Sequence, residues 1–454
     1  MISLELREVA RLVGCPEPDT SLKVDSIVTD SRKVQYGTLF AALKGIQVDG
    51  HDYAETAVSL GAVAVLASRK LELEVPVLVV EDVIRALGII AAEIRNRVDP
   101  IVVGITGSNG KTTVKEMVAS ILKKHCGKKS EVLATGGNYN NELGLPLSLF
   151  GLKKKHRYAV LEMGASQAGD IAYLAGIGRP DVSVITNVGP AHLKGFGSES
   201  GVAHAKGEIF QALGPGGCAV IFGDQHWSEL WHEINAGGRV ITFGQDPAND
   251  VRVVDRETLD TPKGRISFEL PVPGIHNRVN AAAATAVALA LDVDPMNIRE
   301  GLAAFRPAPG RLETKNTDAG WTIIDDSYNA NPASLYSALK VLSEMQGHRW
   351  LVVGDMKELG ENSHKLHAEI GDAASSLGVE RVFAIGEMTA ATVRNFGRGG
   401  MHFEDHDSLI EALTSEIRPG INCLIKGSRS MNMERVVKAL EQASESRMNV
   451  REAG

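Results

Sequence analysis

The segment that most constrains the fold is Ile101 to Thr113, IVVGITGSNGKTT. Apolar, β-favouring residues lead into a glycine-containing loop, and residues 114–122 then follow a helical pattern. A strand, a glycine loop and a helix start form a phosphate cradle, because backbone N–H groups and the positive end of the helix dipole face the anion. In such a loop Lys111 reaches the β- and γ-phosphates, and the hydroxyl of Thr112 binds Mg²⁺.

The loop departs from the widest form of this motif, which needs glycine at position 105. The chain has Ile105 there, with glycines at 104, 107 and 110. The alternative interpretation is a plain glycine turn, but lysine followed by two threonines seldom follows such a turn by chance. We therefore expect nucleotide binding by the loop residues Gly107, Ser108, Asn109, Gly110, Lys111, Thr112 and Thr113.

Length and charge limit the function further. The chain of 454 residues is long enough for about three domains. Its net charge of −8 argues against a nucleic acid or an anionic membrane as the main partner, but not against a local basic pocket. The four cysteines are widely spaced without a CxxC pair, which favours reduced thiols in the cytoplasm and no cysteine metal site. The N-terminus does not resemble a signal peptide, and no apolar run is long enough to span a bilayer.

Alternating strand and helix patterns predict an α/β protein of three units, 1–98, 99–310 and 311–454. The first unit is a smaller α/β domain. Strands of the second unit are predicted at 158–161, 182–186, 219–222 and 240–243. They predict a P-loop-type, mostly parallel sheet with helices on both faces. Strands of the third unit are predicted at 321–325, 350–353, 382–385 and 423–425, in a Rossmann-like α/β domain.

Candidate metal ligands follow two of these strands. Parallel sheets bind ligands beyond the carboxyl ends of their strands, where Glu162 and His192 are expected. Both side chains are placed to complete the Mg²⁺ shell begun by Thr112, although imidazole is a less usual ligand than carboxylate for so hard a cation. Taken singly, Glu162 reads as a capping or surface carboxylate and His192 as a satisfied loop histidine. Together at strand ends of one sheet, the structural and the metal-binding interpretations are evenly balanced.

Other polar residues have both a structural and a functional interpretation. Lys206 lies in a predicted helix, where a solvated lysine is the default. Asn277 and Asn280 share one face near a helix start, and an N-cap explains only one of them, so a base edge or a ribose is a reasonable partner. Thr29 to Arg32 reads as a turn with local side-chain hydrogen bonds.

Three polar loops are expected at strand ends of the third unit. They are DDSYNANP (325–332), GDMKELG (354–360) and KGSRSMNME (426–434). Each alone is explained as a loop followed by a helix N-cap. Together at one sheet edge they suggest a second binding edge.

These motifs together resemble those of the Mur ligases, the ATP-dependent acid–amine ligases of bacterial cell-wall synthesis. TDSRKV, ALKG and DGHDY look like the UDP-binding first domain of the family. TGSNGKTT is similar to the family's phosphate loop, and LEMGAS, TNVGPAHL, AKGEIF, GIHNRVNAAAA and PGRLE to its central ATPase domain. DDSYNANPAS resembles the members that add D-alanyl-D-alanine to UDP-N-acetylmuramoyl-tripeptide, and the chain lacks the DNPR motif of MurE-type members that use diaminopimelate.

The resemblance implies ATP and Mg²⁺ as cofactors and a role for each candidate residue. Catalytic roles are implied for Lys111, His192 and Lys206, the last matching a lysine that is carbamylated in related ligases. The implied Mg²⁺ ligands are Thr112, Glu162 and His192. The implied nucleotide contacts beyond the loop are Asn277, Asn280, Arg311 and Asp326. The implied substrate contacts are Ser31 and Arg32 for the uridine end, Asn138 and Asn141 for the sugar nucleotide, and Tyr328, Asn329 and Ser428 for the dipeptide.

The implied reaction converts the tripeptide carboxylate into an acyl phosphate, which the amine of D-alanyl-D-alanine then attacks, in a cytoplasmic enzyme expected to be a monomer. Two related ligases are alternatives: a MurE-type enzyme that adds one amino acid, and a folylpolyglutamate synthase-like enzyme. A third alternative is an ATP-regulated binding protein that joins nothing. The second α/β unit with its own polar edge argues against that alternative, because a simple switch does not need one.

Overall fold

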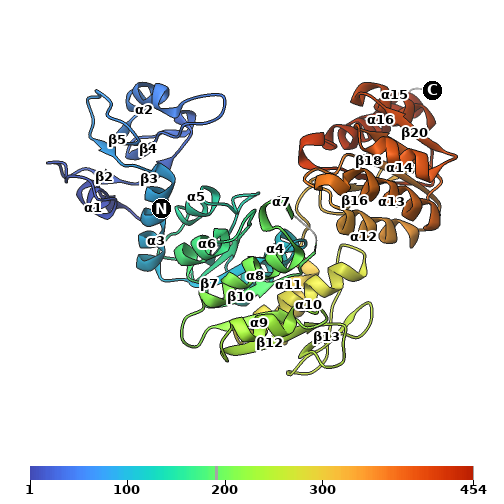
Figure 1. Cartoon of the computed structure of the whole chain (residues 1–454), viewed down its shortest axis with the longest axis horizontal. Helices are drawn as coiled ribbons and strands as arrows, with labels where there is room; N and C mark the ends of the chain where they lie inside the picture. The colour runs from blue at the N-terminus through green and yellow to red at the C-terminus, as the bar shows by residue number, and fades with distance from the viewer. Residues whose placement is uncertain (190–192, 453–454) are drawn as a thin grey trace.

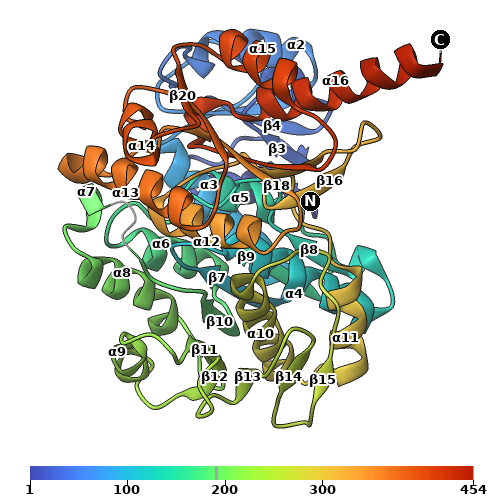
Figure 2. The same ribbon diagram turned by 90° about the vertical axis from the view of Figure 1, so that its right-hand side faces the viewer.

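The structure is a computed structural model that describes residues 1–189 and 193–452, with side chains described except at 193–194 and 448–452. Three α/β units are arranged along the chain. In Figure 1 the N-terminal unit (blue) and the C-terminal unit (orange to red) lie above opposite ends of the central unit (cyan to yellow), and Figure 2 shows the same arrangement from the side. No helix among the described residues is long and apolar enough to cross a bilayer.

The N-terminal unit is built on a four-stranded parallel sheet in the order β3-β4-β5-β6. Its strands are β3 (Ser26–Val28), β4 (Thr38–Ala41), β5 (Ala62–Ala67) and β6 (Val77–Val79). A small antiparallel pair, β1 (Leu4–Glu5) and β2 (Lys23–Val24), lies beside it. The helices are α1 (Leu6–Leu12), α2 (Ala54–Ser59) and α3 (Val83–Val98). Every residue of β5 is buried, as expected for a strand inside a covered parallel sheet.

Helix α3 connects the N-terminal and central units through a shared core. Its apolar residues belong to one buried cluster with residues of both units, and it packs on α5 (Gly144–Leu149) and α6 (Asp170–Gly178). Arg95 of α3 donates to the carbonyl oxygen of Ile177 at 3.3 Å. The helix ends at Asp99, whose φ of 50° turns the chain, and the next strand begins two residues later. The two units are therefore held together by packing.

The central sheet has nine strands in the order β15-β14-β13-β12-β11-β10-β7-β9-β8. They are β7 (Ile101–Thr106), β8 (Val132–Ala134), β9 (Tyr158–Glu162), β10 (Val182–Ile185), β11 (Cys218–Phe222), β12 (Arg239–Gly244), β13 (Val251–Val253), β14 (Thr258–Asp260) and β15 (Ile266–Ser267). β7 pairs in parallel with β9 on one side and β10 on the other, so the strand order changes direction there. Such a switch point opens a crevice at the carboxyl end of the strand, where ligands of α/β sheets bind.

Helices cover both faces of the central sheet, as the sequence pattern predicts. α4 (Lys111–Cys126), α10 (Ile275–Ala290) and α11 (Pro295–Ala304) form one core with it. The other face packs on α3, α5, α6, α8 (Glu199–Gln211) and α9 (Ser228–Ile234). A short helix, α7 (Leu193–Phe196), precedes α8. The alanine-rich α10 is almost wholly buried, because small side chains let it approach α4 and the sheet closely.

The C-terminal unit is Rossmann-like, with strand order β16-β17-β21-β18-β19-β20. The strands are β16 (Glu313–Asn316), β17 (Thr322–Asp326), β18 (His348–Gly354), β19 (Arg381–Ile385), β20 (Gly400–Phe403) and β21 (Ile421–Lys426). The helices are α12 (Pro332–Ser343), α13 (Ser363–Ser376), α14 (Thr389–Phe396), α15 (His406–Glu416) and α16 (Glu434–Glu452). All pairs are parallel except that of β16 with β17, so five strands carry their carboxyl ends to one edge.

Candidate active site

The phosphate loop runs from the end of β7 to the start of α4, and two of its glycines are required by their surroundings. A Cβ on Gly107 would lie 1.9 Å from the Thr186 hydroxyl, and one on Gly110 would lie 2.6 Å from Oδ1 of Asn280. Both also have positive φ, 149° and 81°. Neighbouring polar side chains therefore occupy the space that a larger residue would need.

A neighbouring strand end holds the loop in shape. The Asn109 amide donates to Oδ1 of Asn187 at 3.0 Å, and its carbonyl accepts from Thr186 Oγ1 at 2.5 Å and from Asn187 Nδ2 at 3.0 Å. The Ser108 amide donates to the Asn187 carbonyl at 2.8 Å. Thr186 and Asn187 were not among the predicted site residues. The available signal was their place in TNVG, at the end of the strand predicted at 182–186.

Lys111 lies at the phosphate loop, and its side chain folds back onto the loop. Its Nζ donates to the carbonyl oxygens of Gly107 at 2.6 Å and Ser108 at 3.2 Å. Burial lowers the pKa of Lys111, and the Arg311 charge adds to this while Glu162 opposes it. The amine thus bonds to its own loop, and phosphate oxygens would be stronger, charged acceptors at the same place. Thr113 lies in the first turn of α4.

Glu162 at the end of β9 is a buried carboxylate that is only 2% exposed, and each of its two oxygens accepts a hydrogen bond. Oε2 accepts from the Thr112 hydroxyl at 2.9 Å, and Oε1 accepts from Asn140 Nδ2 at 2.8 Å. The Glu162 amide donates to Thr135 Oγ1 at 3.0 Å. The surface-carboxylate interpretation is therefore wrong, and Glu162 and Thr112 meet as the metal-ligand prediction requires.

This pair fits a Mg²⁺ ion shared with a phosphate. Carboxylate and hydroxyl oxygens are hard ligands, and Mg²⁺ usually takes one or two carboxylates together with phosphate oxygens and water. No three His, Cys, Asp or Glu side chains cluster as a protein-only metal site within the part of the chain that the structure describes. His192, the third predicted ligand, lies outside the described residues.

Lys206 contradicts the default of a solvated helix lysine. It is 3% exposed on α8, and its Nζ lies 6.0 Å from the centre of the Phe196 ring. Burial lowers the pKa of Lys206 well below its ordinary value, and the Lys111 charge adds to the effect. A neutral amine is the form that reacts with carbon dioxide to give a carbamate, so this environment suits the predicted modification.

The start of α10 carries the predicted nucleotide residues beside the loop. Asn277 and Asn280 are buried on one face, where Asn280 Nδ2 donates to Asn277 Oδ1 at 3.3 Å, as their spacing predicts. Asn277 Nδ2 also donates to the Pro273 carbonyl at 2.7 Å. Burial, with the charges of Lys426 and Arg278 adding to it, lowers the pKa of His276 to about 4. His276, which the sequence pattern singled out beside the two asparagines without a site role of its own, therefore stays neutral near pH 7.

The C-terminal unit reaches the phosphate loop through Arg311. Its guanidinium donates to Thr112 Oγ1 at 3.5 Å and lies 4.1 Å from the centre of the Tyr328 ring. Asp326 forms an ion pair with Lys426 and accepts from the Leu312 amide at 3.2 Å. Burial raises the pKa of Asp326, although the ammonium of Lys426 opposes the shift.

The three polar loops of the C-terminal unit meet at one edge, as predicted. The Ser428 hydroxyl accepts from the Lys357 amide at 2.8 Å and donates to the Ala330 carbonyl at 3.5 Å, so it touches both other loops. Asn329 is exposed, and its carbonyl accepts from Lys426 Nζ at 2.9 Å. A cavity of about 240 Å³ opens beside this edge, lined by Pro332, Leu359 and Leu366 and by Glu358, Asn362, Lys365 and Glu369.

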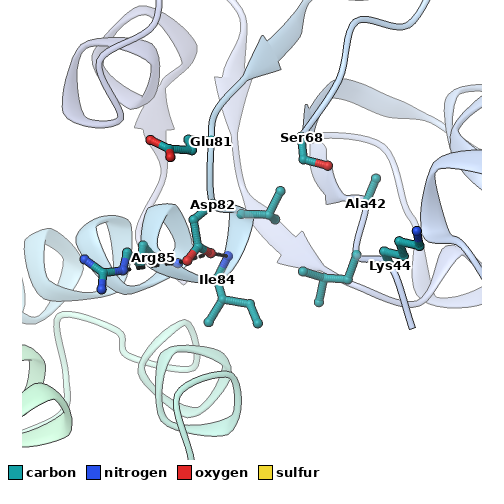
Figure 3. Close-up of a pocket in the computed structure, with 9 residues that line it drawn as sticks. Ala42, Lys44, Ser68, Glu81, Asp82, Ile84 and Arg85 are labelled. Carbon is teal, nitrogen blue, oxygen red and sulfur yellow. Dashed lines mark hydrogen bonds and ion pairs between the residues drawn. The ribbon is translucent and has the colours of Figure 1, made fainter. Parts of the chain in front are cut away.

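The N-terminal unit has a cavity of about 560 Å³ at the carboxyl edge of its sheet (Figure 3). Residues after β4 and β5, including Lys44 and Ser68, and the start of α3 line it. Ser31 and Arg32 follow β3 on the same edge but do not line the cavity. Arg32 donates two hydrogen bonds of 2.9 Å to Asp30, which confirms the predicted local turn and lowers the pKa of Asp30 to about 2.

The asparagine-rich loop contacts the site through a residue that was not selected. Asn140 bonds Glu162, whereas Asn138 and Asn141 are exposed and Asn141 Oδ1 accepts from the Gly144 amide at 2.9 Å. Lys115 of α4 is buried and donates to the Thr135 carbonyl at 2.7 Å, so the loop begins at a fixed point beside the phosphate-loop helix.

Comparisons with known proteins give one consistent result. Three family models match: "Mur ligase family, catalytic domain" over residues 23–124, "Mur ligase middle domain" over 105–288, and "Mur ligase, glutamate ligase domain" over 310–429. The chain is 40% identical to the UDP-N-acetylmuramoyl-tripeptide–D-alanyl-D-alanine ligase of Escherichia coli, covering 97% of the chain and 99% of that protein.

Two solved structures are similar over most of the chain. MurF from Acinetobacter baumannii has a TM-score of 0.89 at 33% identity, covering 97% of this chain and 99% of that one. MurF from Thermotoga maritima, in complex with ADP, has a TM-score of 0.83 at 31% identity, covering 93% and 98%.

Proposed function

The chain belongs to the Mur ligase family, and from this premise we propose that its site joins D-alanyl-D-alanine to UDP-N-acetylmuramoyl-tripeptide at the expense of ATP. The observation that carries this function is the meeting of the Lys111 loop, the buried Thr112–Glu162 pair and Arg311 at one point between two units. A nucleotide bound there would present its terminal phosphate at the boundary between the ATP-binding and amine-binding parts of the protein.

In the first step the tripeptide carboxylate attacks the γ-phosphoryl group and forms an acyl phosphate. Two anions must meet, so the cationic side chains of Lys111 and Arg311 offset their repulsion. Mg²⁺, held by Thr112 and Glu162, would supply further charge neutralisation at the phosphate oxygens. The loop has its shape before the phosphates bind, because Thr186 and Asn187 fix its backbone.

In the second step the neutral amine of D-alanyl-D-alanine attacks the acyl carbon, and phosphate leaves. We propose that Tyr328, Asn329 and Ser428 lie beside the dipeptide, because the polar loops of the C-terminal sheet converge there. Arg311, stacked on Tyr328, is well placed to stabilise the oxyanion. Water must be kept out at this stage, because an acyl phosphate hydrolyses readily.

The remaining assignments are proposals of the same kind. We place Asn277, Asn280 and Asp326 near the nucleotide, Asn138 and Asn141 near the sugar, and the uridine end at the sheet edge that holds Ser31, Arg32 and the cavity of about 560 Å³. We propose units 1–98, 99–310 and 311–454, since each of the three larger sheets draws its strands from one unit. We also propose a cytoplasmic monomer; the four free cysteines and the nucleotide substrates support the cytoplasmic location.

The test is phosphate release with different amine acceptors. With UDP-N-acetylmuramoyl-tripeptide, ATP and Mg²⁺, we expect release with D-alanyl-D-alanine and only background release with a single amino acid. The Lys111→Ala variant should release little phosphate with any acceptor, because the loop loses its cation. Release with a single amino acid but not with the dipeptide would favour a MurE-type activity instead.

A further inference from the structure

Asn331 joins the C-terminal unit to the phosphate loop with one side chain that has two partners. Its Oδ1 accepts from the Ser334 amide at 2.9 Å and so caps α12. Its Nδ2 donates to Oδ1 of Asn109 at 2.7 Å, across the boundary between the units. The cap accounts for the first bond, but it does not require the second.

Both ends of this link are rigid. The backbone of Asn109 is held by Thr186 and Asn187, which fixes the point from which its side chain extends toward Asn331. On the other side, Asn331 and Ser334 form a capping box at the start of α12, with Pro332 at its first position. A shift of the loop would therefore be passed to the helix.

Helix α12 has a second contact with the central unit. A Cβ on Gly274, just before α10, would lie 2.8 Å from Cγ2 of Val341. The residues directly before Asn331 form part of the polar edge of the C-terminal unit, since Asn329 accepts from Lys426 and Ala330 from Ser428. The same short segment thus touches the phosphate loop and carries the edge where the dipeptide is proposed to bind.

We propose that Asn331 is a positioning residue. It holds the polar edge of the C-terminal sheet, where the dipeptide is proposed to bind, at a set position relative to the phosphate loop, so that ATP is consumed only when a peptide bond forms. This rests on the proposed ligase function. When this relative position is lost, water competes with the amine for the acyl phosphate. The water oxygen bonds to the acyl carbon, phosphate leaves with the electron pair of the C–O bond, and a proton is released. The acid is regenerated, and one ATP is spent without a product.

Substitution by serine separates the two roles of the side chain. Serine caps helices as well as asparagine does but is too short to reach Asn109, so Asn331→Ser keeps the cap and loses the link. Asn331→Ala loses both. Asp405→Ser is the matched control, because Asp405 caps α15 of the same unit by accepting from the Ser408 amide at 2.8 Å.

The measurement is the ratio of phosphate released to peptide bond formed, with kcat, the melting temperature and the Kd for ADP measured on the same variants. For Asn331→Ser we expect a ratio above that of the wild type. We also expect a kcat lower by about fivefold, because the free energy of one neutral hydrogen bond corresponds to a rate change of about this size. Melting temperature and ADP affinity should stay near wild type. Adding Asn109→Ala to Asn331→Ser should lower kcat no further than Asn109→Ala alone, since both remove the same bond.

Two results would overturn the proposal. One is an Asn331→Ser variant with the kcat and ratio of the wild type. The other is a loss of kcat that parallels a loss of melting temperature, at an unchanged ratio, which would mark a structural role only. A wild-type protein that binds ADP but forms no bond with D-alanyl-D-alanine would instead contradict the proposed function, and that result is read from the wild type alone.

Discussion

At the scale of single residues, the site contains several buried charged side chains. Glu162 is the clearest case, since Thr112 and Asn140 each occupy one of its oxygens. Burying a carboxylate is costly unless hydrogen bonds or a cation compensate, and two neutral donors compensate only in part. The charge of Lys111 and the proposed Mg²⁺ would supply the rest of the compensation.

We expect Glu162→Gln to fold normally but to need at least tenfold more Mg²⁺ for half-maximal turnover, roughly the loss seen when even an outer-shell partner of a metal is removed. The measurement is turnover against Mg²⁺ concentration. Glu300→Gln is the control, because Glu300 only pairs with Lys124 on the surface. An unchanged Mg²⁺ requirement in Glu162→Gln would remove this residue from the shell.

Lys206 leads to a prediction about carbon dioxide. Burial holds its pKa well below the ordinary value, which favours the neutral, nucleophilic form of the amine. We expect turnover to fall in buffer freed of carbon dioxide and to return when bicarbonate is added. Lys206→Arg, which keeps the charge but forms no carbamate, should be weakly active and indifferent to bicarbonate. Wild-type turnover that ignores bicarbonate would contradict the proposed modification.

At the scale of elements, the phosphate loop shows how far the sequence predicts the site. The loop, its lysine and its threonine follow from the order of strand, glycines and helix. The hydrogen bonds that Thr186 and Asn187 make to the loop do not, because they depend on β10 lying beside β7, and the paired residues Thr106 and Ile185 are 79 positions apart in the chain.

 β10 begins at Val182, 76 residues after β7 ends at Thr106, so local patterns do not reveal which side chains will meet the loop.

Gly107→Ala should abolish nucleotide binding, because its Cβ would overlap the Thr186 hydroxyl that braces the loop. The control is Gly176→Ala in α6, where the structure leaves open space for the added methyl group. Alanine in a helix interior should raise the stability of that variant by roughly 0.5–1 kcal/mol. Calorimetric titration with ADP and thermal unfolding of both variants check the pair. ADP affinity that survives in Gly107→Ala would show that the brace is unnecessary.

His276 at the start of α10 makes the stability of the fold depend on pH. His276 has a pKa of about 4 in the folded chain, below its ordinary 6.5, so the unfolded chain binds more protons between these values. Stability is therefore lost as pH falls from about 6.5 to about 4, by about 3 kcal/mol at most from this residue. Unfolding by urea across this range should show a shallower pH dependence for His276→Gln than for the wild type. The exposed His232→Gln control should match the wild type, and equal slopes in all three would contradict the account.

Several strands that the sequence did not predict are short. β13, β14 and β15 extend the central sheet beyond β12, and β16 pairs antiparallel with β17. Strands of two to four residues carry too little alternation to stand out, and they exist because a neighbouring strand supplies their hydrogen bonds. The burial of Lys206 was equally hidden, since it depends on Phe196 from a separate helix.

At the scale of the whole molecule, the three units divide the reaction between them. The central unit holds the phosphate loop and shares a core with the N-terminal unit through α3, which keeps that sheet edge at a set position. The C-terminal unit reaches the loop through Arg311 and Asn331. The order of the units follows from the motifs. Their contacts join residues that are 199 positions apart (Arg311 and Thr112) and 222 positions apart (Asn331 and Asn109), so no local pattern predicts them.

The central claim is that the loop aims a phosphoryl group at the tripeptide carboxylate. The most direct test is to label both oxygens of that carboxylate with oxygen-18 and to analyse the phosphate released during ligation to D-alanyl-D-alanine by mass spectrometry. An acyl phosphate predicts that each phosphate released carries one labelled oxygen, since the carboxylate oxygen leaves with it. Phosphate without label, at a normal yield of peptide bond, would contradict the account.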